Sequence, residues 1–90
     1  MVGQYTLYSK SGCKYCAFAK NDFLAMQKNG IDVQYLEVSL DSPEIERDFK
    51  SKHPNLTTLP QVFAPNGGHI GGYEDLTEHF KAIVDLSDWI

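Results

Sequence analysis

Residues 8–16 read Tyr8-Ser9-Lys10-Ser11-Gly12-Cys13-Lys14-Tyr15-Cys16 and join a predicted strand to a predicted helix. The strand covers residues 4–9, which are rich in β-branched and aromatic side chains. The helix covers residues 15–28, where apolar and polar side chains interleave, and Asn29-Gly30 supplies its C-terminal stop. A second strand is predicted over residues 33–38. A strand, a helix and a strand in this order predict a right-handed parallel unit.

The rest of the chain predicts a helix, a hairpin and a last helix. Ser42 supplies a capping hydroxyl for a helix over residues 43–52, which has proline at its first position. A short strand over residues 61–64, a turn over residues 65–68 and a returning strand from residues 69–70 form the hairpin. A core-facing stripe marks the last helix and consists of Leu76, Phe80, Ile83 and Val84. The predicted fold class is α/β in the order βαβαββα.

Composition and length limit the classes of protein that this chain can belong to. Of its 90 residues, 42% are hydrophobic and 22% are charged, which is typical of a globular protein and excludes wholesale disorder. Its apolar runs are too short for a membrane span, and residues 1–4 lack the basic start of a secretory signal. There is no repeat or linker, so we expect one domain over residues 1–90, located in the cytoplasm.

The charges of the chain are unevenly distributed. The formal net charge is −4, yet residues 1–20 carry three lysines and no acidic residue. Such an acidic chain is a poor nucleic-acid binder, because binding the phosphate backbone needs many basic residues on one face. The positive charge surrounds both cysteines instead.

The two cysteines, Cys13 and Cys16, are too few for a disulfide framework, and C-x-x-C spacing beside a strand and a helix indicates redox chemistry. Cys13 is expected over the first helical turn, where unpaired amides, the helix dipole, Lys10 and Lys14 all favour its thiolate. The thiolate is the nucleophile. Cys13 is therefore predicted to attack, and Cys16, inside the helix and with a higher pKa, to resolve the mixed disulfide.

Two other interpretations of the cysteines are weaker. They could be ordinary core residues, or half of a zinc site, which needs four ligands. The only other candidate ligands, apart from carboxylates, are His53, His69 and His79, which lack ligand spacing and are interpreted as surface residues. The position of the cysteines between a strand end, a helix start and a lysine cluster favours redox chemistry.

Three segments follow one another along the chain. After residues 8–16 come Thr58-Leu59-Pro60-Gln61-Val62-Phe63 and Ile70-Gly71-Gly72-Tyr73-Glu74-Asp75-Leu76. Together they resemble the glutaredoxins of the thioredoxin superfamily, over a span from Tyr5 to about Phe80. The resemblance implies a thioredoxin-like fold with a central four-stranded mixed sheet flanked by helices. It also implies glutathione as the reductant of the Cys13/Cys16 pair.

The resemblance further implies a glutathione site. Pro60 would be cis, which places the backbone of Leu59 beside the active site, whereas the plain alternative is a trans proline that opens an edge strand. Glu74 and Asp75 would complement the last helix's dipole, and Asp75 would receive the γ-glutamyl ammonium. The implied glutathione-binding residues, with Lys10 and Tyr15 at the glycine end and the sulfur, are Lys10, Tyr15, Thr58, Leu59, Pro60, Gly72, Glu74 and Asp75. The residues assigned to packing are Tyr5, Phe63 and Trp89.

Lys14 departs from the usual Cys-Pro-Tyr-Cys motif of the family. Lysine adds a charge near Cys13 and lacks the fixed φ of proline, so the family's reduction potential does not transfer. Three alternatives stay open: a thioredoxin-like carrier reduced by a flavoprotein, an iron–sulfur scaffold, and a structural adaptor with inert thiols.

The resemblance also implies which molecules the protein meets. The expected partners are glutathione and disulfide-containing or glutathionylated proteins, with ribonucleotide reductase as a candidate client. We expect a monomer with no bound metal, no nucleic-acid partner and no membrane association.

Overall fold

The computed structural model describes residues 3–88, with side chains up to residue 83. Its elements confirm the predicted order βαβαββα. They are β1 (Gly3–Ser9), α1 (Lys14–Lys28), β2 (Val33–Ser39), α2 (Pro43–Lys52), β3 (Gln61–Phe63), β4 (His69–Gly71) and α3 (Tyr73–Asp88).

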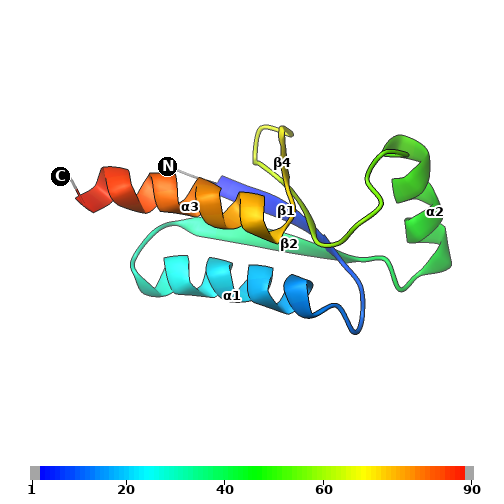
Figure 1. The fold of residues 1–90 in the computed structure, drawn as a ribbon, viewed down its shortest axis with the longest axis horizontal. Coiled ribbons are helices and arrows are strands. Elements are labelled where there is room, and N and C mark those ends of the chain that lie inside the picture. The colour runs from blue at the N-terminus through cyan, green and yellow to red at the C-terminus, as the bar shows by residue number, and fades with distance from the viewer. Residues whose placement is uncertain (1–2, 89–90) are drawn as a thin grey trace.

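The four strands form one mixed sheet in the order β2-β1-β3-β4 (Figure 1). Strand β1 is parallel to β2, and α1 makes the connection between them, as the strand–helix–strand pattern predicted. Strand β3 is antiparallel to both β1 and β4. The fold is therefore the thioredoxin-like α/β arrangement that the resemblance implied.

Strand β1 is packed on both faces because its side chains alternate. Tyr5 and Leu7 lie in the main core, which also contains Phe23 of α1 and Leu76 of α3. Helices α1 and α3 lie side by side on this face (Figure 1). Tyr8 points the other way, and its ring lies 4.5 Å from that of Phe49 in α2, measured between centroids. Packing on both sides fixes the end of β1, from which the loop to Cys13 starts.

Helix α1 buries one stripe of its surface, made of Cys16, Ala19, Phe23 and Met26. These residues recur at three- and four-residue intervals, which keeps them on one side of a helix. The stripe begins with Cys16 in the first turn. Docking of the helix therefore places the cysteine pair at the end of the sheet where β1 finishes.

Two local predictions need correction. Ser42 is the N-cap residue of α2, but its side chain makes no capping hydrogen bond, and the acidic Glu44 and Glu46 in the first turn complement the helix dipole instead. Strand β3 ends at Phe63 rather than at residue 64, and the amide of Ala64 instead donates a 2.7 Å hydrogen bond to the carbonyl of Gly68 in the turn.

His79 is not a simple surface residue, contrary to the prediction. Its Nε2 lies 2.7 Å from the hydroxyl oxygen of Tyr5, which is 1% exposed. A buried hydroxyl needs a hydrogen-bonding partner, and packing of α3 on β1 supplies one. The side chain of Val84 and the whole of Trp89 lie outside the described residues.

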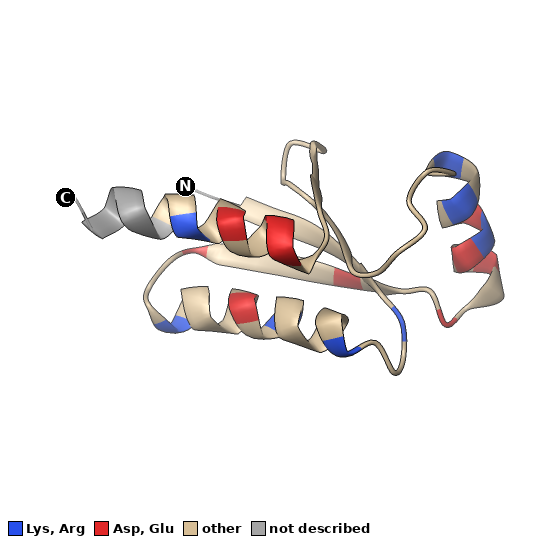
Figure 2. Cartoon of the chain, viewed as in Figure 1, with Lys and Arg blue, Asp and Glu red and all other residues tan. Residues whose placement is uncertain are grey.

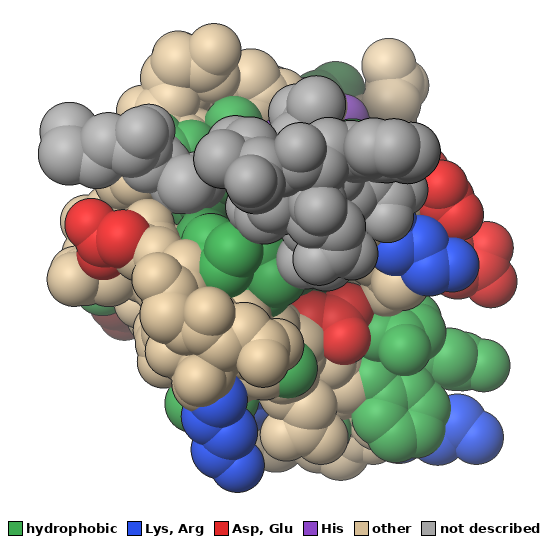
Figure 3. Space-filling model, turned by 90° about the vertical axis from the view of Figure 1, so that its left-hand side faces the viewer, with side chains coloured by type: hydrophobic (Ala, Val, Ile, Leu, Met, Phe, Trp, Pro, Cys, Tyr) green, Lys and Arg blue, Asp and Glu red, His purple; other side chains and the backbone are tan. Residues whose placement is uncertain are grey.

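The end of the molecule opposite the cysteines faces the viewer in Figure 3, where charged side chains of both signs lie among apolar ones. Within residues 3–88, no helix has the length and apolarity needed to cross a bilayer.

Candidate active site

Cys13 and Cys16 form a disulfide at the N-terminus of α1, with Cα atoms 5.2 Å apart. Cys13 is the N-cap residue, and its Sγ accepts a hydrogen bond of 3.1 Å from the backbone amide of Cys16. This amide is one of the unpaired donors of the first turn, so in the reduced protein it favours negative charge on Cys13. Cys16 is only 2% exposed, whereas Cys13 is half-buried. A substrate therefore reaches Cys13 first.

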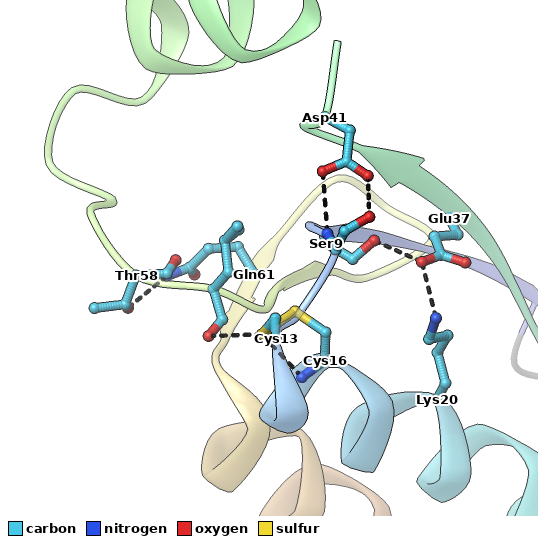
Figure 4. The surroundings of a disulfide bond; sticks show 10 residues. Ser9, Cys13, Cys16, Lys20, Glu37, Asp41, Thr58 and Gln61 are labelled. Carbon is cyan, nitrogen blue, oxygen red and sulfur yellow. Dashed lines mark hydrogen bonds and ion pairs between the residues drawn. A yellow bond between two sulfur atoms is a disulfide. The ribbon is translucent and has the colours of Figure 1, made fainter. Parts of the chain in front are cut away.

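The loop before β3 lies directly against this sulfur (Figure 4). Its Leu59–Pro60 peptide bond is cis, which confirms the expectation from the resemblance. The carbonyl oxygen of Leu59 lies 3.7 Å from Sγ of Cys13. The backbone of this loop is therefore within reach of any chain that approaches Cys13.

Gln61 connects that loop to β4. Its Nε2 donates hydrogen bonds to the carbonyl oxygen of Thr58 at 3.0 Å and to the Thr58 hydroxyl at 3.3 Å. Its Oε1 lies 2.7 Å from Nε2 of His69, and since an amide oxygen can only accept, His69 is the donor. The side chain of Gln61 thus ties the loop beside Cys13 to the sheet.

A cleft of about 480 Å³ opens between the loop and the start of α3. Its volume is in the range of small-molecule sites. The resemblance implied eight glutathione-binding residues, and seven of them line this cleft: Tyr15, Thr58, Leu59, Pro60, Gly72, Glu74 and Asp75. The fold therefore gathers residues from α1, the loop and α3 around one space.

The acidic end of the cleft has a specific backbone geometry. Gly71 has φ +127°, and a Cβ there would collide with the carboxylate of Asp75. The amide of Gly72 donates a hydrogen bond of 3.2 Å to Oδ2 of Asp75. Only glycine at position 71 leaves space for the Asp75 carboxylate to contact the backbone at residues 71 and 72. Acidic residues at the start of α3 are visible in Figure 2.

A second pocket of about 420 Å³ contains both cysteines and has a different charge. Its charged residues are Lys10, Lys14, Lys20, Glu37 and Asp41. Figure 2 shows basic residues on the loop before α1 and on the first turn of that helix.

Asp41 holds the loop that precedes Cys13. One carboxylate oxygen accepts a hydrogen bond of 3.1 Å from the amide of Ser11, and the other accepts one from the Ser11 hydroxyl. The hydrogen bonds from Ser11 hold the pKa of Asp41 below its ordinary value. These two hydrogen bonds between Asp41 and Ser11 join the chain after β2 to the loop that leads into Cys13.

Glu37 on β2 accepts two hydrogen bonds at Oε2. The hydroxyl of Ser9 donates one at 2.6 Å, and the ammonium of Lys20 donates the other at 3.1 Å (Figure 4). The Ser9 hydroxyl first, and then Lys20, hold the pKa of Glu37 below its ordinary value against the opposing effect of burial. Glu37 therefore carries its negative charge at neutral pH, paired with Lys20.

Comparison with known proteins matches this architecture to one family. The glutaredoxin family model matches residues 5–70, which include the cysteine pair and the cis-proline loop. The chain belongs to the glutaredoxin family. Members of this family are thiol–disulfide oxidoreductases that work with glutathione and protein disulfides, and this chain is a thiol–disulfide oxidoreductase with a dithiol motif.

Individual glutaredoxins align with this chain over most of their length. Glutaredoxin 1 of Escherichia coli strain K12 is 29% identical over 84 residues, which cover 91% of this chain and 98% of that protein. Glutaredoxin 3 of the same strain is 34% identical over 70 residues, covering 78% and 77% of the two chains. The solved structure of reduced E. coli glutaredoxin superposes with a TM-score of 0.74 at 32% identity, covering 92% of this chain and 99% of that one.

In this glutaredoxin, Lys10 does not line the larger cleft, but it lines a smaller pocket together with Thr58 and Leu59 of the implied glutathione-binding set. Its ammonium is 3.1 Å from Oε2 of Glu46 in α2, and Lys50 approaches the same oxygen at 3.8 Å. Lys10 lines the pocket around the cysteines rather than the larger cleft. The cause is α2, which offers an acidic partner on its first turn.

Several residues of this glutaredoxin site were missed by the sequence analysis. Gln61, His69 and Tyr73 line the cleft, and Glu37 and Asp41 line the cysteine pocket. Lys20 had a usable signal, because it follows Cys16 by four positions, which is one helical turn. Gln61 and Tyr73 stand within the quoted motif segments, and Gln61 is three residues from its partner Thr58, so both also had a signal. Glu37 and Asp41 had none, since their partners Ser9 and Ser11 lie far away in the sequence. Within the described residues, no group of three or more His, Cys, Asp or Glu side chains is arranged to hold a metal ion.

Proposed function

We propose that this glutaredoxin is reduced by glutathione and reduces protein disulfides and glutathionylated cysteines through Cys13 and Cys16. The observation that carries the proposal is the cleft of about 480 Å³ beside the cis Leu59–Pro60 bond. Leu59, which lines the cleft, has its carbonyl oxygen 3.7 Å from Sγ of Cys13, the more accessible sulfur of the pair.

The chemistry of the cleft suits a γ-glutamyl tripeptide. The exposed backbone around Leu59 offers hydrogen bonds to an extended peptide, and Glu74 and Asp75 offer negative charge to an ammonium group. Lys10 would receive the terminal carboxylate of the tripeptide, for which it has to leave Glu46. Tyr15, 51% exposed, flanks the space where the sulfur of the ligand would lie.

The proposed reaction consists of four thiol–disulfide exchanges, the last two with glutathione. The Cys13 thiolate attacks a sulfur of the client disulfide, and the client's other sulfur leaves as a thiolate. Cys16 then attacks Sγ of Cys13, which releases the reduced client and forms the Cys13–Cys16 disulfide seen in the structure. Two glutathione molecules return two electrons to the pair and leave as glutathione disulfide. For a glutathionylated client, the Cys13 thiolate attacks the sulfur of the bound glutathione, and the client leaves as a thiolate. Glutathione stays on Cys13 until a second thiol displaces it.

We also propose the setting of this chemistry. Residues 1–90 act as one glutaredoxin domain, a monomer in the cytoplasm, whose reducing environment keeps thiols reduced. Ribonucleotide reductase is a candidate client by family resemblance alone. We propose no resident metal, no nucleic-acid partner and no membrane association.

The deciding experiment compares two reductants on the same oxidised protein. Glutathione with glutathione reductase should reduce it and sustain turnover, whereas a thioredoxin-type flavoprotein reductase should not. Cys13→Ser should abolish both reactions, and Cys16→Ser should keep only glutathionyl exchange. Turnover with the flavoprotein reductase alone would instead support the thioredoxin-like carrier, and full activity of Cys13→Ser would refute both.

The iron–sulfur scaffold has a separate test. After anaerobic reconstitution with iron and sulfide, the proposed enzyme should stay colourless and monomeric. Absorbance of visible light together with a dimer on gel filtration would favour the scaffold. If the protein is an inert adaptor, both thiols should be alkylated slowly at every moderate pH. If it is the proposed enzyme, Cys13 should be alkylated rapidly well below pH 8, where an ordinary cysteine with a pKa of about 8.5 is still protonated.

A further inference from the structure

Cys16 lies beside a fixed pair of opposite charges that the proposed reaction does not use. It shares the pocket of about 420 Å³ with Lys20 and Glu37. Lys20 follows it by one turn on α1, and side chains four positions apart on a helix are neighbours. The ammonium of Lys20 is held 3.1 Å from Oε2 of Glu37, which the Ser9 hydroxyl fixes at 2.6 Å (Figure 4).

The resolving step makes a specific demand on Cys16. Its thiol has to lose a proton before it can attack, yet it is only 2% exposed, and burial disfavours a charged sulfur. The amide of Cys16 itself does not help, because it donates to Sγ of Cys13. Cys16 therefore depends on charges farther along the helix and on the facing strand.

We propose that Lys20 and Glu37 are positioning residues that jointly control the thiolate of Cys16. The ammonium of Lys20 favours the thiolate, and the carboxylate of Glu37 restrains this effect by holding Lys20 at β2. The pair thereby sets how long the mixed disulfide on Cys13 survives before Cys16 resolves it. This inference rests on disulfide exchange at the cysteine pair and is independent of glutathione as the reductant.

The controlled step balances as follows. The Cys16 thiol gives its proton to solvent, and the resulting thiolate attacks Sγ of Cys13. The bond between Cys13 and the client sulfur breaks, and the client leaves as a thiolate that takes a proton from solvent. Over the attack by Cys13 and this attack by Cys16 together, the cysteine pair loses two electrons and the client gains them.

Other charged groups of the pocket are engaged elsewhere. Lys10 is paired with Glu46 of α2, and Asp41 is bound by Ser11. Lys14 extends over the ring of Tyr15, 5.6 Å from its centroid. These groups stay in place when Lys20 or Glu37 is replaced, so a difference between those two variants isolates the pair.

The test uses Cys13→Ser protein, in which Cys16 is the only thiol, and follows thiolate absorbance against pH. Lys20→Met should raise the midpoint because Glu37 is left unbalanced, and Glu37→Gln should lower it because Lys20 is released. For a unit charge about 8 Å from a thiol, Coulomb's law gives a midpoint shift of about 0.4 to 1.5 pH units, between the screening of water and that of a protein surface. The double variant should titrate close to the parent.

Lys28→Met and Glu78→Gln are the matched controls. Both positions are exposed, and the two substitutions change the net charge in the same way as Lys20→Met and Glu37→Gln. They should leave the midpoint unchanged. Lys20→Arg, which keeps the charge, should titrate like the parent and shows whether a loss in Lys20→Met is merely structural. Shifts of the two test variants in the same direction, or no larger than those of the controls, would overturn the proposal.

A kinetic measurement gives an independent outcome. If Glu37→Gln lowers the Cys16 midpoint by about one pH unit, the thiolate fraction rises about ten-fold while its nucleophilicity falls about three-fold. Resolution of a Cys13 mixed disulfide should then be about three- to four-fold faster, as measured by acid quenching and mass spectrometry. An unchanged or slower rate in this variant would also count against the pair. Neither measurement involves glutathione, so failure here and failure of the glutathione proposal are distinguishable.

Discussion

The backbone amide of Cys16 points at Sγ of Cys13 and donates a hydrogen bond of 3.1 Å to it. The relationship is asymmetric: the half-buried Cys13 receives the stabilising donor, and the fully buried Cys16 supplies it. One sulfur is thereby prepared to be an anion, while the other depends on the charges of Lys20 and Glu37. The helix start is thus the source of the division of roles within the pair.

Lys14→Pro should stabilise the protein. Position 14 is the first of α1, where proline is tolerated, and Cys13 already has the extended backbone that a following proline requires (φ −86°, ψ 106°). The free energy of unfolding should rise by about 0.4–1 kcal/mol in urea titrations. Lys14→Gln, which removes the charge alone, should leave stability unchanged; both variants should raise the pKa of reduced Cys13. A destabilised Lys14→Pro protein would contradict this view of the helix start.

Gly71→Ala should damage both stability and ligand binding. The new Cβ would meet the Asp75 carboxylate at a φ of +127°, so strain of about 1–3 kcal/mol is expected in the free energy of unfolding. Displacing Asp75 should also raise KM for glutathione. Gly67→Ala is the control: its φ is +88° but its surroundings are open, so it should lose stability without a change in KM. Equal KM values for the two variants would exclude the proposed role of Asp75.

Asp41→Asn should change how stability depends on acid. The folded-state pKa of Asp41 is lowered by Ser11, so its contribution is present above the ordinary aspartate pKa of about 3.9 and is lost as pH falls through the lowered value. The parent should therefore be more stable than Asp41→Asn at neutral pH, and the two should converge in strong acid. Thermal melts of both proteins between neutral pH and strong acid measure this difference in stability. A difference that is constant at every pH would contradict the lowered pKa of Asp41.

Glu46→Gln should improve the use of anionic substrates. It releases Lys10, whose ammonium is held at 3.1 Å, and an exposed ion pair of this kind is weak. KM for a glutathionylated peptide should fall by up to about five-fold with kcat unchanged. Glu44→Gln, on the same turn and with an exposed side chain, is the control. A fall in KM of the same size in the control would point to net charge rather than to Lys10.

Tyr5→Phe should destabilise the protein without affecting catalysis. The change removes the 2.7 Å hydrogen bond to His79 and leaves the packing of the ring intact. The free energy of unfolding should fall by about 0.5–1.5 kcal/mol. Coupled activity assays should give an unchanged kcat/KM, because Tyr5 and His79 do not line either pocket of the active site.

Patterns within short segments were enough to predict most of the architecture. The β-branched and aromatic content of residues 4–9 and the interleaved apolar and polar side chains of residues 15–28 are local features, and a parallel strand–helix–strand unit has one favoured hand. The C-x-x-C spacing placed both sulfurs on the first turn of a helix, which is where the structure has them. The cis bond before Pro60 was expected only by resemblance, because the local sequence favours trans.

The sequence patterns within short segments did not predict the contacts between distant segments. Lys10 contacts Glu46, which is 36 positions away, and Tyr5 and His79 are 74 positions apart. The sequence alone therefore established the order of the elements and the chemistry of Cys13 and Cys16, because both follow from neighbours within a helical turn or a strand. Which charged side chains face the sulfurs was decided only when β2 and α2 packed around β1, since a residue's pattern specifies its own face of an element and not the partner that packing brings to it.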